Sequence, residues 1–240
     1  HFIFYRYDET RRGLLKFVLK DIDADGYIIW GRVPVVKEVE ALGKSLHSKI
    51  VLVETLNAGH ELACVLPNFF DSFSQLIKRL QAAKREKLFF LYSERYSWMD
   101  DIRALKSLYE SRDIRFIDFS NRSSTEDIED DTTLRDAVYE IVGHGLPDVM
   151  LFFSDWPAMK SIKYMKEKGV SVPDDVEVIG ALNFRLAEVC EPPLTSMSVD
   201  PELIGRRAVE QLRRMILEGV PPQLERIPMT LVERASTKNQ

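Results

Sequence analysis

The stretch CEPPLTSMSVDPELIG, residues 190–205, contains three prolines and, between the second and the third, a run with no helical period. Pro192 and Pro193 keep the residues before them out of a helix, because the proline ring clashes with a helical neighbour. Residues 194–199 are therefore predicted to be extended, and Pro201 stands where the first helical turn tolerates a missing N–H. An extended run far from either end of the chain, followed by a long helix, indicates a crossing between two halves of the protein. An ordinary surface loop is the alternative interpretation.

Outward from this stretch, the chain alternates short apolar runs with amphipathic stretches of helical period. The runs are HFIFY, GYIIW, KIVLV, ACVLP, KLFFLY, IRFIDF, VMLFF and VEVIGAL, and helices are predicted between most of them. Repeated strand and helix units predict parallel sheets, and near-continuous apolar strands indicate that helices cover both faces. The predicted fold class is α/β, with two doubly wound, Rossmann-like parallel sheets. The pattern pauses at QAAKREK, residues 81–87, which places the boundary between the two halves there.

The composition limits the classes of partner. The 240 residues carry 33 basic and 38 acidic side chains, a net charge of −5. A chain this acidic lacks the positive surface that a domain needs to grip nucleic acid phosphates itself. No apolar run approaches the roughly 20 residues of a membrane-spanning helix. Cys64 and Cys190 lie far apart and form no CxxC pair, so two reduced thiols are predicted.

Motifs for catalysis and metal binding are missing from the sequence. It has no GxSxG, GxGxxG, Walker or HExxH pattern. Its four histidines are scattered, and the acidic run STEDIEDDTT, residues 124–133, lacks the alternating ligands and central glycine of a calcium loop. We therefore predict no catalytic residue, no metal and no cofactor. A sugar-phosphate enzyme on a similar fold is the alternative.

Candidate ligand contacts follow from the strand order, because ligands of open parallel sheets bind beyond the carboxyl ends of the strands. Carboxylates and amides bind hydroxyl groups, arginine adds a fixed set of donors, and aromatic faces cover apolar patches. The polar and aromatic residues near the predicted strand ends are Tyr7, Arg32, Asn68, Asp71, Trp98, Arg103, Ser154, Asp155, Asn183 and Phe184.

Several of these residues also have a structural interpretation. Asp71 and Ser154 lie in first turns of predicted helices, where capping of free amides would explain them. Trp98 could be a core or dimer-contact residue. Arg32 and Arg103 could be solvated or paired with acids.

A family resemblance rests on the second half of the chain. Residues 154–180, SDWPAMKSIKYMKEKGVSVPDDVEVIG, contain a polar residue and aspartate, a helix, a glycine, and then VPDD before a strand. Together with PPLTSMSVDPELIGRRAVEQL and the closing LVERAST, this segment resembles the effector-binding core of the lactose-repressor (LacI/GalR) family of bacterial transcription regulators. Earlier in the chain, DADGYIIWG and VLPNFFDSFSQLIKRL are similar to the family mainly in pattern.

The resemblance implies a periplasmic-binding-protein-like type I fold, in which three crossovers join two subdomains and a small effector binds in the cleft between them. The N-terminal subdomain would comprise residues 1–83 and 200–226, without the family's first strand and helix. The C-terminal subdomain would comprise residues 84–199 and 227–237. The resemblance also implies a cytoplasmic homodimer, with operator DNA bound by a helix-turn-helix headpiece that is not in this chain. No membrane partner is expected.

Individual residues carry over from the family only in part. Asp71 falls where the family often has a polar or acidic ligand contact, and Ser154 falls on a ligand-contacting position that varies. The family's pocket arginine corresponds to Arg103 when counted from LFFLY, or to Asp101 when counted back from DIRFI; the chemistry favours Arg103. The acid that the family places after IG and an aromatic residue is replaced around Leu182, so an acceptor for sugar hydroxyls is lost or shifted by one residue.

The sequence therefore predicts the effector-sensing core of a LacI-type transcription regulator. It would bind a small carbohydrate-like or related metabolite and modulate operator binding by the separate headpiece. The alternative is a transport-type solute-binding protein of the same fold. The LVERAST ending favours the regulator.

Overall fold

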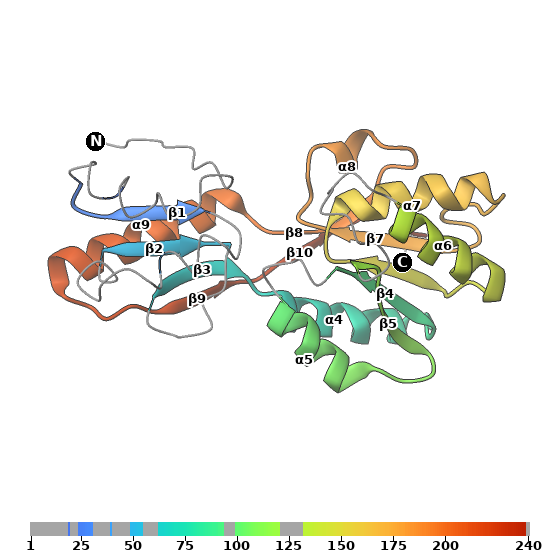
Figure 1. Cartoon of the computed structure of the whole chain (residues 1–240), viewed down its shortest axis with the longest axis horizontal. Helices are drawn as coiled ribbons and strands as arrows, with labels where there is room; N and C mark the ends of the chain where they lie inside the picture. Colours follow the sequence, from blue (N-terminus) through green and yellow to red (C-terminus); the bar gives the residue numbers. More distant parts are fainter. Residues whose placement is uncertain are drawn as a thin grey trace. The chain divides into compact units, whose positions relative to one another are not determined.

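The computed structural model describes residues 24–30, 49–54, 62–93, 99–120 and 132–238, together with Leu19 and Val39. The chain divides into two compact units (Figure 1). Unit 1 comprises His1–Asn68 and Asp200–Ile227, and unit 2 comprises Phe69–Val199 and Pro228–Gln240. The predicted first strand, HFIFY, lies outside the described residues.

Unit 1 contains a parallel sheet with the strand order β1-β2-β3-β9. The strands are β1 (Tyr27–Trp30), β2 (Ile50–Val53), β3 (Ala63–Pro67) and β9 (Leu224–Ile227). The first three match predicted apolar runs; the side chains of β2 and β3 are almost all buried, whereas β1 alternates partly buried and exposed side chains. Strand β9 was not predicted, since LERI places two charged residues between its two apolar ones and is buried only at its last position.

Helix α9 (Pro201–Glu218) follows the quoted stretch and packs on β1, β2 and β3. The Asp200 carboxylate accepts bonds from the backbone N–H groups of Glu202 and Leu203, at 2.9 and 3.1 Å, and so caps the helix. The helix ends at Gly219, whose φ of 68° is left-handed and suits glycine. The start and the end of this helix were both predicted from the sequence.

Unit 2 contains a second sheet with the strand order β10-β8-β7-β6-β4-β5. Its strands are β4 (Leu88–Tyr92), β5 (Ile114–Asp118), β6 (Val149–Phe152), β7 (Glu177–Ala181), β8 (Thr195–Ser198) and β10 (Thr230–Val232). All neighbours are parallel except β10, which pairs antiparallel with β8. The tail that was predicted to join a sheet therefore forms an edge strand.

Helices cover both faces of the unit 2 sheet, as Figure 1 shows. They are α4 (Phe69–Ala82), α5 (Met99–Tyr109), α6 (Thr132–His144), α7 (Asp155–Glu167) and the short α8 (Leu186–Val189). Apolar side chains of α6 and α7 pack with Phe89, Met150 and Phe152 on one face. On the other face, Phe73 of α4 packs against Phe90 and Phe153. Burial on both faces explains why the strands are apolar without alternation.

The first passage between the units differs from the predicted boundary at residue 83, because α4 belongs to unit 2. The rings of Phe73 and Phe153 lie 4.7 Å apart, centre to centre. The Ser72 hydroxyl accepts a bond from the backbone N–H of Met229 at 3.0 Å. Helix α4 is thus held by the unit 2 sheet, and the chain passes between units at Asn68–Phe69, before the helix rather than after it. The other two passages follow Val199 and Ile227.

The extended run in the quoted stretch is a strand of unit 2 and not a free connection. Residues Thr195–Ser198 form β8, and the chain leaves unit 2 directly after Val199. Thr195 and Ser196 are completely buried. The C-terminal segment satisfies Thr195, since its N–H donates to the Ser236 hydroxyl and its own hydroxyl lies 2.8 Å from that of Thr237. Buried polar groups need such partners, which is why a polar run can form an inner strand.

Candidate functional site

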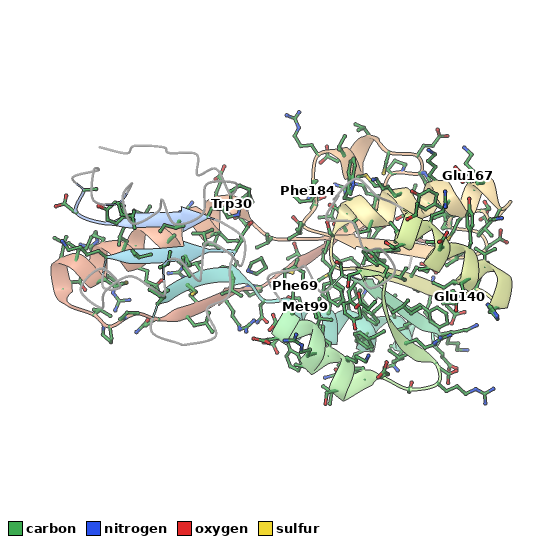
Figure 2. All side chains as sticks on the ribbon, in the orientation of Figure 1. Trp30, Phe69, Met99, Glu140, Glu167 and Phe184 are labelled. Carbon is green, nitrogen blue, oxygen red and sulfur yellow. The ribbon has the colours of Figure 1, made fainter. Side chains whose placement is uncertain are left out.

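The carboxyl ends of three neighbouring unit 2 strands bring together four of the predicted contact residues. Ser154 and Asp155 follow β6, Asn183 and Phe184 follow β7, and β8 ends at Ser198. Because β6, β7 and β8 are adjacent and parallel, these ends meet at one edge of the sheet. Phe184 is labelled on this unit in Figure 2. We call this region the carboxyl edge of unit 2.

Asp155, the first residue of α7, is the buried centre of the carboxyl edge. Its side chain has no exposed surface. The Ser196 hydroxyl and the Phe184 N–H each donate to one of its carboxylate oxygens, both at 2.6 Å. Burial raises the pKa of Asp155 to about 6, while these two hydrogen bonds act in the opposite direction. Asp155 was predicted as a ligand contact, and in the structure both of its carboxylate oxygens accept hydrogen bonds from the protein.

The raised pKa of Asp155 predicts a pH-dependent contribution to stability. Protonation is favoured in the folded state, because the folded pKa of about 6 exceeds the ordinary value of 3.8. The stabilisation is therefore complete below the unfolded pKa and is lost as pH rises through 6. We expect the unfolding free energy of the wild type, relative to Asp155→Asn, to increase by about 1.4 kcal/mol between pH 7.5 and pH 5. Urea denaturation at both pH values measures it, and a constant difference would contradict it.

Asn183 connects three structural elements at the carboxyl edge. Its side-chain oxygen accepts a bond from the Arg234 guanidinium at 2.8 Å, and its side-chain nitrogen donates to the Ser198 hydroxyl at 3.2 Å. Its backbone N–H donates to the Ser196 hydroxyl at 3.1 Å. Arg234 also donates to the Leu194 carbonyl at 2.8 Å. Both polar ends of the Asn183 amide are therefore occupied by protein groups.

The backbone at residues 182–183 is left-handed. Leu182 has a φ of 84° and Asn183 a φ of 50°. Asparagine tolerates this region, but for leucine it costs on the order of 1 kcal/mol. The Leu182 N–H donates to the Met197 carbonyl at 2.8 Å, which holds the strained residue against β8. The loop after β7 is thus fixed by its neighbours rather than by its own preference.

Other groups of the carboxyl edge remain accessible. Ser154 stands at the N-cap position of α7, but its hydroxyl makes no cap bond. The side chains of Phe184 and Trp156 are 47% and 51% exposed. Lys160 lies over the Trp156 ring, 4.7 Å from its centre. A hydroxyl group and two aromatic surfaces can therefore meet a small polar molecule that also has apolar faces.

The remaining predicted contacts are placed as follows. Asn68 ends unit 1 and donates its N–H to the Ile227 carbonyl at 2.8 Å. Asp71 lies exposed in the first turn of α4. Arg103 of α5 pairs with Asp100 at 3.1 Å, and both side chains are more than half exposed. Residues outside the described parts of the chain are Tyr7, Arg32 and Trp98.

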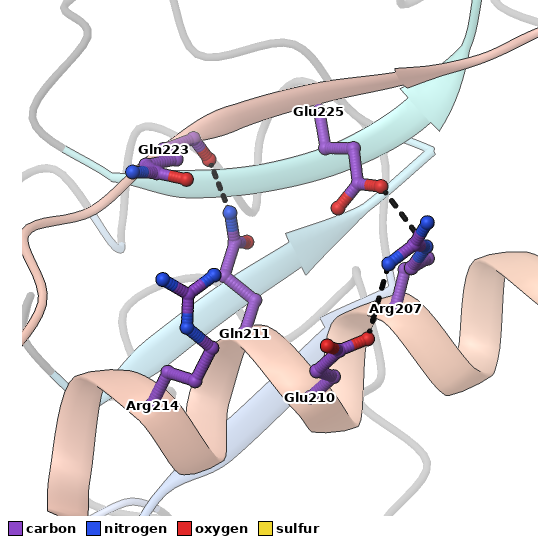
Figure 3. A pocket seen from close by; sticks show the side chains of 6 residues that line it. All are labelled: Arg207, Glu210, Gln211, Arg214, Gln223 and Glu225. Atoms are coloured by element: carbon purple, nitrogen blue, oxygen red, sulfur yellow. Dashed lines mark hydrogen bonds and ion pairs between the residues drawn. The ribbon is translucent and has the colours of Figure 1, made fainter. Parts of the chain in front are cut away.

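A separate groove lies in unit 1 between α9 and β9, with an empty volume of about 250 Å³ that includes open solvent (Figure 3). Gln211 donates to the Gln223 carbonyl at 2.8 Å, while its buried oxygen has no partner. Arg207 pairs with both Glu210 and Glu225 at 3.2 Å. Arg214 also lines the groove, so its two arginines balance its two glutamates. The groove therefore offers a ligand little more than one unpaired acceptor, which a water molecule would satisfy.

Comparisons with known proteins agree with this architecture. Residues 77–237, well over half of the chain, match the periplasmic binding protein-like domain family. The chain belongs to this family. The matched part contains nearly all of unit 2 and both later passages between the units.

Relatives of this periplasmic binding protein-like domain are transcription regulators. The regulator GalR of Streptococcus thermophilus is 35% identical over 97 residues, 40% of this chain. A helix-turn-helix-type regulator of Lachnoclostridium phytofermentans is 23% identical over 190 residues, 78% of this chain. The aligned parts span only 29% and 56% of these two regulators.

A solved structure confirms the predicted fold class. A LacI-family transcriptional regulator from Enterococcus faecalis with bound ribose has a TM-score of 0.71 at 20% identity. The alignment covers 96% of this chain and 84% of that one. Together with the family match and the regulator relatives, this structure confirms the predicted resemblance of this periplasmic binding protein-like domain to a LacI/GalR effector-binding core.

Sequence reasoning missed three residues that organise the carboxyl edge of this periplasmic binding protein-like domain: Ser196, Ser198 and Arg234. The two serines are two positions apart in a strand, so their side chains share one face. This two-residue spacing in TSMS was a signal from which the two serines could have been predicted to act together. The position of Arg234 depends on the antiparallel pairing of β10 with β8, which no local pattern specifies.

Proposed function

We propose that this chain is the effector-sensing core of a LacI-type transcription regulator. The observation that carries this proposal is the match of residues 77–237 to the periplasmic binding protein-like domain family, together with the sequence similarity to regulators such as GalR. The effector is a small carbohydrate-like metabolite, a class supported by the ribose held in the structural relative. Its binding shifts an equilibrium between two states of the chain, and only its difference in affinity for those states drives the shift.

The carboxyl edge of unit 2 contributes contacts to this effector. Ser154 supplies a hydroxyl that makes no cap bond, and Phe184 and Trp156 supply exposed aromatic faces of the kind that cover apolar sugar faces. Asn68, Asp71 and Arg103 are further candidate contacts. Asp155 and Asn183 act behind the contact surface, by holding the loop that carries Phe184.

The regulator works as a cytoplasmic homodimer without catalytic activity, and a helix-turn-helix headpiece outside this chain binds operator DNA. The helix-turn-helix type of the regulator relatives supports the DNA-binding headpiece. Among the described residues, no helix is long and apolar enough to cross a membrane. In the same ranges, no three potential metal-ligating His, Cys, Asp or Glu side chains gather at one point.

A screen of sugars by thermal shift tests the proposal. A compound that binds only the folded state at a concentration of 100 Kd adds about 2.7 kcal/mol of stability. We therefore expect at least one sugar or sugar derivative to raise the melting temperature of this chain by several degrees. The same compound should change the affinity of the full-length protein for operator DNA selected from a random pool.

The matched control is a non-binding stereoisomer of the same sugar, which has the same composition and should leave the melting temperature unchanged. A compound that stabilises the chain but leaves operator affinity unchanged would favour the alternative, a solute-binding protein. No stabilisation by any member of a broad carbohydrate panel would contradict an effector of this class.

A further inference from the structure

Asn183 lies where the loop after β7 is bonded to both of the strands that connect directly to unit 1. Ser198, which accepts from the Asn183 side-chain nitrogen, is the last residue of β8, and the chain leaves unit 2 after Val199. Arg234, which donates to the Asn183 oxygen, follows β10, the strand that begins after the chain returns at Pro228. One amide therefore contacts the outgoing segment and the returning segment.

The chemistry defines the orientation of this amide. A guanidinium group can only donate hydrogen bonds, so the Asn183 oxygen must face Arg234 and its nitrogen must face Ser198. Arg234 is well buried, with 14% of its side chain exposed, and is also bonded to the Leu194 carbonyl. Charge-assisted bonds of this kind are stronger than neutral ones. The Asn183 amide is consequently held at both ends by groups that have little freedom to move.

The loop has a second attachment on its other side. The buried Asp155 carboxylate accepts from the Phe184 N–H, directly after Asn183. The exposed ring of Phe184 is thus one residue from the amide that contacts the two connecting strands. A displacement of the loop through Phe184 cannot be absorbed locally, because the polar groups beside it are bonded to β8 on one side and to α7 on the other.

We propose that Asn183 is a positioning residue that couples the loop after β7 to two of the three segments connecting unit 2 with unit 1, those that follow Val199 and Ile227. This inference rests on the proposed function, in which an effector contacts that loop. The Ser198 bond transmits the position of the loop to the outgoing segment, and the Arg234 bond transmits it to the returning segment.

Hydrogen–deuterium exchange of the ligand-free 240-residue chain tests the coupling. In Asn183→Ala, peptides covering residues 196–203 and 226–235 should exchange about tenfold faster than in the wild type. Peptides from β4 and β6, in the centre of the sheet, should keep their wild-type rates. A residue with a merely structural role would lower global stability and accelerate all of these peptides together.

Two conservative variants probe the two bonds. Asn183→Asp keeps an oxygen for Arg234, and its second oxygen can accept from the Ser198 hydroxyl, so both contacts can persist and neither segment should exchange faster. Ser198→Ala removes only the contact with the Asn183 nitrogen, so only residues 196–203 should exchange faster. The control is Ser161→Ala, which removes a fully buried hydroxyl of α7 that has no hydrogen-bond partner. It should leave both connecting segments unchanged.

Unchanged exchange in Asn183→Ala, or equal acceleration in every peptide, would overturn the coupling. So would acceleration of residues 226–235 in Asn183→Asp as large as in Asn183→Ala. Because these measurements need no effector, their failure would reject only the role of Asn183. The sugar screen and operator measurement decide the proposed function separately.

Discussion

Replacing Phe73 by alanine is expected to lower the free energy of unfolding of unit 2 by about 3–5 kcal/mol. The Phe73 ring is completely buried. Its centre lies 4.7 Å from that of Phe153, 6.0 Å from that of Phe69 and 6.2 Å from that of Phe90. The variant loses the free energy gained when a large apolar side chain is buried away from water. It also leaves a cavity that its rigid neighbours cannot fill.

The effect of Phe73→Ala should be large for a second reason. The ring attaches α4 to the unit 2 sheet, and α4 directly follows the first passage between the units. Urea denaturation followed by circular dichroism measures the loss. Phe184→Ala is the matched control, because it makes the same chemical change at a half-exposed ring and should cost less than about 1 kcal/mol. Equal losses in the two variants would contradict the aromatic core described above.

Gly180→Ala is expected to destabilise unit 2 by about 3 kcal/mol, at the upper end of the usual cost of overpacking. A Cβ atom at this position would lie 2.2 Å from an Asp155 carboxylate oxygen, 2.8 Å from a Leu194 side-chain carbon and 3.2 Å from the Asp155 Cα. Asp155 cannot move away without breaking its bonds to Ser196 and Phe184. The substitution should therefore also loosen the loop after β7.

Gly205→Ala is the control for this substitution. Gly205 lies within α9 and has no atom within 4 Å of an added Cβ. Alanine there should stabilise unit 1 by up to about 1 kcal/mol, because glycine is a poor helix former. Thermal and urea denaturation of both variants should thus give changes of opposite sign. A neutral Gly180→Ala variant would contradict the close packing of Asp155 against β7.

Most of the secondary structure could be predicted because its signals are local. The apolar runs LFFLY, VMLF and EVIGA form strands β4, β6 and β7, and α9 begins and ends where Asp200 and Gly219 predict. Strands β8 and β9 were harder, because TSMS and LERI are polar or mixed. Their place in a sheet depends on partners distant in sequence, such as Ser236 for Thr195.

The candidate site could be predicted only as a set of positions. The rule that ligands bind beyond the carboxyl ends of strands selected Ser154, Asp155, Asn183 and Phe184, and the structure brings these residues to one edge. The rule could not show which of these side chains are free of hydrogen bonds within the protein. Asp155 looked like a ligand contact from its position, yet its oxygens are taken by the backbone of one element and the hydroxyl of another.

The sequence by itself determined the class of fold and the order of most strands and helices, because hydrophobic period, proline and glycine act within a few residues. Its motifs in the second half of the chain carried the resemblance to the family. The tertiary structure decided that α4 packs in unit 2 and that Arg234 meets Asn183. It also decided that the Asp155 carboxylate is buried. Each of these depends on groups distant in sequence that meet only when the sheets form, so no local pattern of residues contains them.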